Sequence, residues 1–166
     1  MMHQPFGLGF VLSSAVLLGT AGIAALPVRA APSPFIELAG TWSGNGQIRL
    51  QSGQKEQLSC RAFYTPKSGG ADMGMALRCA SASYKIELRS DLRYQGGAVT
   101  GSWEERTFNA AGNVSGRATG GQIHLTFSGN VTGSMSVTYS GATQTVTIVT
   151  SGSELSGVSL NLARGG

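Results

Sequence analysis

The sequence is poor in the residues from which most catalytic and metal sites are built. Its 166 residues include two cysteines and two histidines, and charged residues make up 12% of the chain. Metal sites draw three or four ligands from Cys, His, Asp and Glu side chains brought close together. Because His3 lies in the N-terminal segment discussed below, His124 is the only histidine left for a folded domain. We therefore expect no metal site and no cofactor.

Sequence motifs of the common enzyme classes are missing as well. The chain contains no Gly-x-Ser-x-Gly turn of a serine hydrolase and no Gly-x-x-x-x-Gly-Lys phosphate-binding loop. A glycosidase needs two carboxyl groups that flank one bond. The one adjacent pair, Glu104 and Glu105, would point to opposite faces of a strand. We expect a non-enzymatic protein.

Charge clusters of the kind that bind nucleic acids do not occur either. Twelve basic and eight acidic residues give a net charge of +4, and they are scattered along the chain. Nucleic-acid binding normally requires basic residues concentrated on one face. The sequence thus predicts no nucleic-acid partner.

Helical periodicity is nearly absent, and a strict alternation of apolar and polar residues takes its place. Such alternation, broken by Gly, Ser, Asn and Thr, is typical of half-buried antiparallel strands. The alternating runs cover residues 42–50, 58–64, 73–79, 84–89, 99–103, 123–127, 131–139, 146–148 and 158–162. No gap between them is long enough for a crossover helix, so consecutive strands are expected to pair as hairpins.

The pattern therefore predicts an all-β fold, an antiparallel up-and-down meander of about eight to ten strands. An open meander leaves two exposed edges, and closure into a barrel removes them. We predict a closed small barrel, with a two-sheet β-sandwich as the alternative. An outer-membrane barrel is a third interpretation, but aromatic residues are only 7% of the chain and no aromatic girdle is recognisable.

An uncharged apolar run over residues 7–26 precedes Val28-Arg29-Ala30, a sequence that signal peptidase accepts. We predict a signal peptide over residues 1–30, a short lead over 31–37 and a single all-β domain over 38–166. The expected location is the periplasm or the outside of the cell, with no stable membrane insertion after cleavage. Because no Lys or Arg precedes the apolar run, an uncleaved N-terminal anchor is the alternative.

The two cysteines, Cys60 and Cys79, are expected to form a disulfide, because an isolated pair in an exported protein normally does. Their midpoint lies between Gly69 and Gly70, which allows two hairpin registers. A four-residue loop over residues 68–71 places both Pro66 and the cysteine pair at non-hydrogen-bonded positions. We predict this second register, because Pro66 has no N–H to donate to a ladder.

The phrases Gly40-Thr41-Trp42 and Gly101-Ser102-Trp103 resemble the Gly-x-Trp strands of calycin barrels, the group of lipocalins, avidins and nitrobindin-like barrels. In those families the first Trp closes one end of the barrel beneath a ligand cavity. The resemblance implies a barrel with a cavity and leaves the ligand open. His124 lies between Ile123 and Leu125, so alternation turns it outward and it has no counterpart among their haem ligands.

We predict that the protein binds a small apolar or amphipathic ligand in its interior, and a cavity above about 300 Å³ would favour this function. Glu105 shares the strand face of Trp103 and is expected at the mouth of the barrel. The candidate cavity residues are Trp42, Tyr64, Met75, Trp103 and Phe127. The same side chains could simply fill the core of a narrow barrel.

An interaction or inhibitor module that binds an envelope protein is the alternative function. It would act through an exposed loop, Pro66 to Asp72, or through a strand face that carries Arg61, Arg78 and Arg89. The sequence leaves the oligomeric state open.

Overall fold

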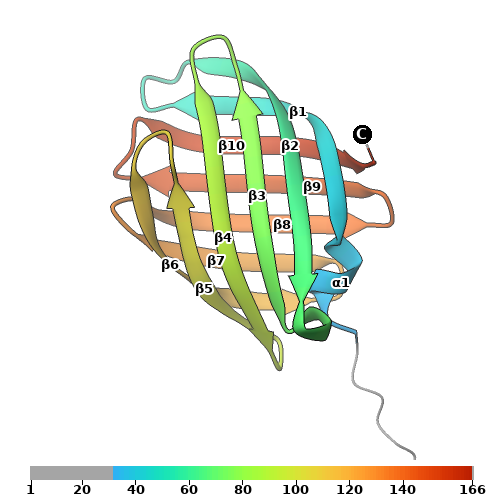
Figure 1. The fold of residues 1–166 in the computed structure, drawn as a ribbon. Helices are drawn as coiled ribbons and strands as arrows, with labels where there is room; N and C mark the ends of the chain where they lie inside the picture. Colours follow the sequence, from blue (N-terminus) through green and yellow to red (C-terminus); the bar gives the residue numbers. More distant parts are fainter. Residues whose placement is uncertain (1–31, 166) are drawn as a thin grey trace, which may run out of the picture. The chain divides into compact units, whose positions relative to one another are not determined.

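The structure is a computed structural model that describes residues 32–165, and the predicted signal peptide and cleavage site lie outside these residues. The described chain forms an antiparallel barrel in which each strand pairs with its neighbours in sequence and β1 pairs with β10 to close the ring (Figure 1). Its strands are β1 (Gly40–Leu50), β2 (Lys55–Lys67), β3 (Asp72–Ala80), β4 (Lys85–Gln95), β5 (Ala98–Glu105), β6 (Ala110–Thr119), β7 (Gln122–Gly129), β8 (Thr132–Ser140), β9 (Thr143–Ser151) and β10 (Leu155–Arg164). The predicted closed meander is confirmed, and the sandwich is not formed.

The alternation read from the sequence is the alternation of burial in the barrel. In β7, Ile123 and Leu125 are buried while His124 between them is exposed. A period of two residues keeps one side chain in each pair away from water on every strand. The inward residues of all ten strands, together with Phe35 and Leu38, form one hydrophobic cluster.

Short turns join the strands, and glycine supplies the conformations that they need. Gly96 and Gly97 connect β4 to β5 with φ angles of 56° and 87°. Two consecutive residues with positive φ form the tight hairpin turn whose twist matches that of the flanking strands. This turn lies where the Gly-Gly pair indicated it.

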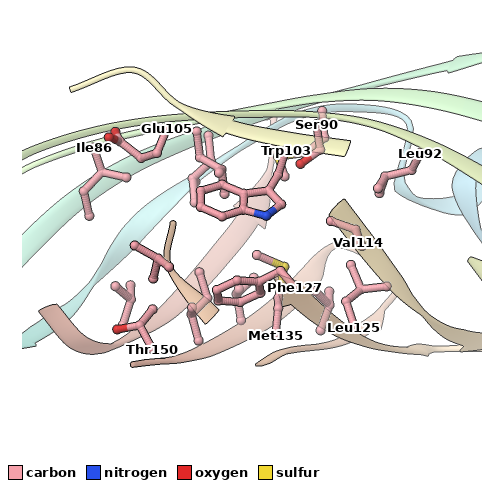
Figure 2. Close-up of a pocket in the computed structure, with 18 of the residues that line it drawn as sticks. Ile86, Ser90, Leu92, Trp103, Glu105, Val114, Leu125, Phe127, Met135 and Thr150 are labelled. Carbon is pink, nitrogen blue, oxygen red and sulfur yellow. The ribbon is translucent and has the colours of Figure 1, made fainter. Parts of the chain in front are cut away.

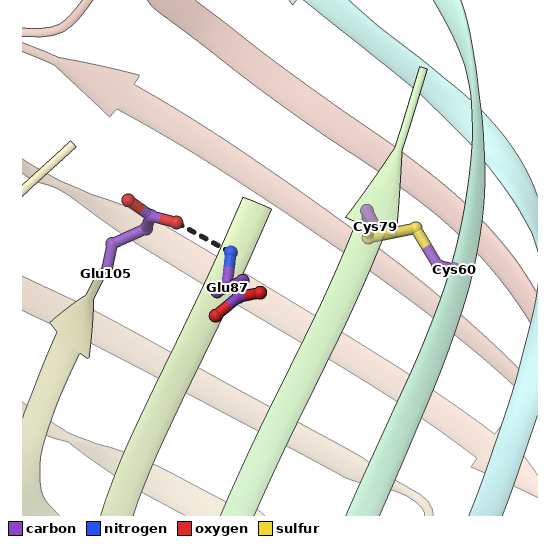
Figure 3. Close-up of a disulfide and its surroundings, with 4 residues drawn as sticks. All are labelled: Cys60, Cys79, Glu87 and Glu105. Carbon is purple, nitrogen blue, oxygen red and sulfur yellow. Dashed lines mark hydrogen bonds between the residues drawn. A yellow bond between two sulfur atoms is a disulfide. The ribbon is translucent and has the colours of Figure 1, made fainter. Parts of the chain in front are cut away.

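The β2–β3 hairpin has the predicted register. Lys67 pairs with Asp72, so the loop has four residues, and Cys60 lies opposite Cys79. Their Cα atoms are 4.1 Å apart, as in a non-hydrogen-bonded pair, and a disulfide joins them (Figure 3). A cross-link that spans 19 residues stabilises the fold by about 3 kcal/mol through the entropy of the unfolded chain.

A short helix, α1 (Pro34–Leu38), precedes the barrel and was not indicated by the sequence pattern. It lies almost wholly in the expected lead, and five residues are too few to show helical periodicity. Ser33 caps it by accepting a hydrogen bond from the Phe35 N–H, and a proline occupies its first turn. Phe35 and Leu38 are buried, so α1 covers the end of the barrel where β1 begins.

The Gly-x-Trp tryptophan joins this helix to the barrel. Trp42 is 0% exposed, and its Nε1 donates to the Leu38 carbonyl at 2.8 Å. The Arg164 guanidinium lies 4.3 Å from the centroid of the Trp42 ring and donates to the carbonyls of Glu37 and Ala39. We call this end of the barrel the closed end.

Candidate functional site

The opposite end of the barrel is formed by the hairpin loops over residues 51–54, 81–84, 106–109, 130–131 and 152–154. No helix of the described chain lies among these loops. An interior cavity extends from Leu38 at the closed end to Phe108 and Ser153 in these loops. We therefore call this end the mouth.

The cavity has a volume of about 140 Å³ and is lined almost entirely by aliphatic, aromatic and methionine side chains (Figure 2). This volume is smaller than the value of about 300 Å³ expected for a pocket that holds a drug-sized ligand. It is close to the volume of an engineered apolar cavity of about 150 Å³ that stays dry and binds benzene or xenon. The barrel is thus neither a wide cup nor completely filled.

Four of the five candidate cavity residues, Tyr64, Met75, Trp103 and Phe127, line this cavity. Trp42 does not. It lies at the closed end of the barrel, where it contacts α1 through the Leu38 carbonyl and the Arg164 guanidinium through its ring. Alternation shows that a side chain points inward. It does not show whether that side chain lines the cavity or closes the end of the barrel.

Trp103 and Phe127 form the aromatic part of the wall. Their ring centroids are 5.6 Å apart and the rings meet edge to face. The Trp103 Nε1 donates to the Ser128 carbonyl at 3.2 Å, so the indole has no need of a polar ligand. Figure 2 shows the Trp103 ring above the Phe127 ring, with Met135 beside Phe127.

A polar bridge crosses the barrel interior between β2 and β9. The Gln144 side-chain amide donates to the Tyr64 hydroxyl at 2.9 Å, and Gln144 is only 2% exposed. Burial raises the pKa of Tyr64 to about 12. The phenol therefore stays protonated and neutral at physiological pH. Gln144 was not among the predicted site residues, although its even spacing from Val146 indicates an inward position.

Glu105 lies at the mouth, as its position two residues after Trp103 indicated. Its Oε1 accepts a hydrogen bond from the backbone N–H of Glu87 at 2.6 Å, and its Oε2 accepts one from the N–H of Phe108 at 2.7 Å (Figures 2 and 3). Both carboxylate oxygens thus bind the protein's own backbone. Glu105 holds the β5–β6 loop, and with it the half-exposed Phe108 ring, against the edge of the cavity.

The remaining polar groups of the wall are few and mostly satisfied. Thr150 donates to the Leu155 carbonyl, and Ser153 accepts from the Leu155 N–H at 3.1 Å. Ser90, 8% exposed, places a hydroxyl among apolar neighbours midway along β4 (Figure 2). Ser90 was not predicted as a site residue either. It continues the inward series two residues after Leu88, but a polar serine gives no sign of burial. A ligand in this cavity would meet one small polar group in a largely apolar surface.

Residues that could bind a metal or haem iron do not gather at the cavity. His124 is exposed on the outer face of β7, with its Nδ1 3.0 Å from the Ser136 Oγ. Within residues 32–165, no three His, Cys, Asp or Glu side chains lie close enough together to hold a metal ion. The cavity therefore offers apolar contact as its main interaction.

The loop over Pro66 to Asp72, one of the two alternative interaction surfaces, supports the closed end. Ser33 donates to the Gly70 carbonyl at 2.6 Å, which ties the loop to the start of α1. A Cβ atom on Gly70 would lie 2.7 Å from the Ile36 side chain, so only glycine allows this close approach. Much of this loop is thus used in holding α1.

No protein-family model and no curated protein sequence matches the chain. Among solved structures, it is similar to Rv2717c from M. tuberculosis, with a TM-score of 0.59 and 13% identity over 81% of this chain and 99% of that one. It is also similar to the S-type phycobiliprotein lyase CPES from Guillardia theta, with a TM-score of 0.56 and 12% identity over 80% and 90% of the two chains. These similarities show the fold alone, a closed antiparallel β-barrel.

Proposed function

We propose that the protein binds a small apolar molecule inside the barrel and does so without catalysis. The observation that carries this proposal is the apolar cavity of about 140 Å³, closed at one end by α1 and bordered at the other by loops. Burial of apolar surface is the main favourable term that such a wall can offer. The polar groups at the mouth and at the closed end already form hydrogen bonds within the protein, so they would neither attract nor orient a strongly polar ligand.

The size of the cavity selects among apolar ligands. A volume close to that of a benzene-binding cavity suits a single ring or a short unbranched chain rather than a fused macrocycle. A longer amphipathic molecule would leave its polar end at the mouth, beside Phe108 and Ser153. The Ser90 hydroxyl gives one point at which a ligand oxygen could be bound.

We also infer that the protein acts outside the cytoplasm. The Cys60–Cys79 disulfide supports this location, because structural disulfides persist in oxidising compartments. Within residues 32–165, no helix is long and apolar enough to span a membrane.

Straight-chain alcohols from butanol to octanol test the proposal. The described chain contains three methionines, Met73, Met75 and Met135, and all three line the cavity, so their labelled methyl groups report on it by NMR. Each added methylene should strengthen binding about fourfold until the cavity is full. Beyond that length the affinity should stop rising. The absence of saturable methyl shifts throughout the series would contradict the proposal.

A matched pair of variants separates cavity binding from adsorption to the surface. Val114→Phe places a ring in the cavity wall, whereas Val149→Phe adds the same ring at an exposed outward position. Val114→Phe should abolish alcohol binding and Val149→Phe should leave it unchanged. Equal binding by the two variants would show that the alcohols adsorb elsewhere. Native mass spectrometry of the protein purified from its host then identifies any retained ligand.

A further inference from the structure

We propose that a hollow on the outer surface of strands β1 to β4 binds a phosphate group between Arg61 and Arg78. The hollow has a volume of about 730 Å³ and is separate from the interior cavity, with which it shares only Ile86. Its outward side chains include Arg61, Arg78 and Lys85, and one acidic residue, Glu87. It therefore combines a concave surface with an excess of positive charge.

The two arginines oppose each other directly across two strands. Arg61 of β2 is the cross-strand partner of Arg78 of β3. Like charges at directly opposed positions destabilise a strand pair. The repulsion would be relieved by an anion bound between the two guanidinium groups.

The acidic residues of the neighbouring surface do not neutralise this pair. The ion pairs within residues 32–165 join other partners: Lys67 to Asp91, Arg93 to Asp72, and Arg106 to Glu104. None of them includes Arg61, Arg78 or Lys85. Glu87 is the cross-strand neighbour of Arg78 and leaves the group of three basic side chains with a net positive charge.

A disulfide fixes the position of both arginines, and an aromatic ring contacts one of them. The disulfide between Cys60 and Cys79 lies one residue before Arg61 and one after Arg78, and it fixes the register that makes them opposite. The Arg78 guanidinium lies 5.9 Å from the centroid of the Phe63 ring. A guanidinium that stacks on an aromatic ring loses less freedom when it binds an anion.

The chemistry of the site fits a phosphate group better than a carboxylate. Each guanidinium offers a planar fork of N–H donors that matches two oxygens of a phosphate. A phosphate dianion can use two forks at once, whereas a single carboxylate satisfies one. Lys85 adds a third cation, and Asn45 and Ser59 supply uncharged polar groups on the β1 side of the hollow.

Titration with inorganic phosphate at constant ionic strength, followed by NMR, tests the proposal. Saturable shifts should appear at residues around Arg61, Arg78 and Lys85 and not at the methionine methyl groups of the interior cavity. Each of Arg61→Gln and Arg78→Gln should weaken binding about tenfold or more, because each removes charge-assisted hydrogen bonds.

Arg117→Gln is the matched control, because Arg117 is exposed on β6 and changes the net charge equally. It should retain phosphate binding. Equal losses in Arg117→Gln and Arg61→Gln, or the absence of saturation in the unmodified protein, would overturn the proposal.

Vesicles of phosphatidylglycerol form a second arm that distinguishes two sources of the phosphate group. Binding to vesicles that is lost in Arg61→Gln and retained in Arg117→Gln identifies a lipid headgroup as the source. Phosphate binding without vesicle binding identifies a soluble phosphate compound. Because the hollow is separate from the cavity, failure of this test leaves the alcohol test unaffected.

Discussion

The guanidinium of Arg164, near the end of the last strand, lies 4.3 Å from the centroid of the Trp42 ring near the start of the first strand. The two residues are also cross-strand partners in the β1–β10 pairing that closes the barrel. The same guanidinium donates to the carbonyl of Glu37, in the last turn of α1, and to that of Ala39, which follows the helix. One side chain therefore connects the helix, the first strand and the last strand.

Removal of this guanidinium should loosen the closed end. Arg164→Ala removes the contact with the Trp42 ring and the two hydrogen bonds to carbonyls, so we expect the free energy of unfolding to fall by about 1–2 kcal/mol. Urea denaturation measures this loss. Arg117→Ala, at an exposed position on β6, should change the free energy of unfolding by less than about 0.5 kcal/mol. Equal effects of the two variants would mean that Arg164 does not stabilise the closed end.

The carboxylate of Glu105 should control the mobility of the mouth. Glu105→Gln keeps the shape of the side chain but leaves one carbonyl oxygen where two carboxylate oxygens now bind the N–H groups of Glu87 and Phe108. We expect amide hydrogen exchange at Phe108 and Glu87 to become about tenfold faster.

Glu104→Gln is the matched control for this experiment. Glu104 is exposed and its carboxylate lies 3.8 Å from the Arg106 guanidinium, an arrangement that contributes little to stability. Exchange at Phe108 and Glu87 should be unchanged in this variant. Unaltered exchange in Glu105→Gln would show that the loop is held by its other contacts.

The buried phenol of Tyr64 should make the barrel sensitive to high pH. Its pKa is raised from 10.0 to about 12 by burial, so the folded state keeps the proton at pH values where the unfolded chain has lost it. The stabilising contribution is fully present below pH 10 and is lost as the pH rises from 10 to 12. A shift of this size corresponds to about 3 kcal/mol.

Denaturant unfolding at pH 9 and at pH 11.5 checks this expectation. The pKa values of Tyr84 and Tyr139 are also raised, by a hydrogen bond to Glu154 and by burial respectively. Comparison with Tyr64→Phe therefore isolates the contribution of Tyr64. The variant should lose less stability than the unmodified protein between these two pH values. An identical loss in both proteins would assign the sensitivity to other groups.

The sequence was sufficient to predict the barrel because period-two burial is a local property of each strand. The register of the hairpin that carries Cys60 and Cys79 followed from two requirements. Only the four-residue loop places both Pro66 and the cysteine pair at non-hydrogen-bonded positions. These features depend on residue type and spacing, and they are confirmed by the pairing of the strands.

The details of the interior depend on packing across the barrel, which alternation does not encode. Ser90 and Gln144 face inward although they are polar. Gln144 can do so because it binds Tyr64, which is 80 residues away in the sequence. Trp42 could not be distinguished from a wall residue without knowledge of α1 and Arg164. The volume of the cavity depends on all these side chains together.

The pairing of β1 with β10 also has a consequence for the order in which the chain can fold. Ala39 and Arg164, which meet at the closed end, are 125 residues apart in the sequence. The edge of β1 that pairs with β10 therefore stays open until the final strand is available. A topology that depends on so distant a contact folds slowly. Loss of the last strand from a truncated chain would leave two open sheet edges able to pair with other chains.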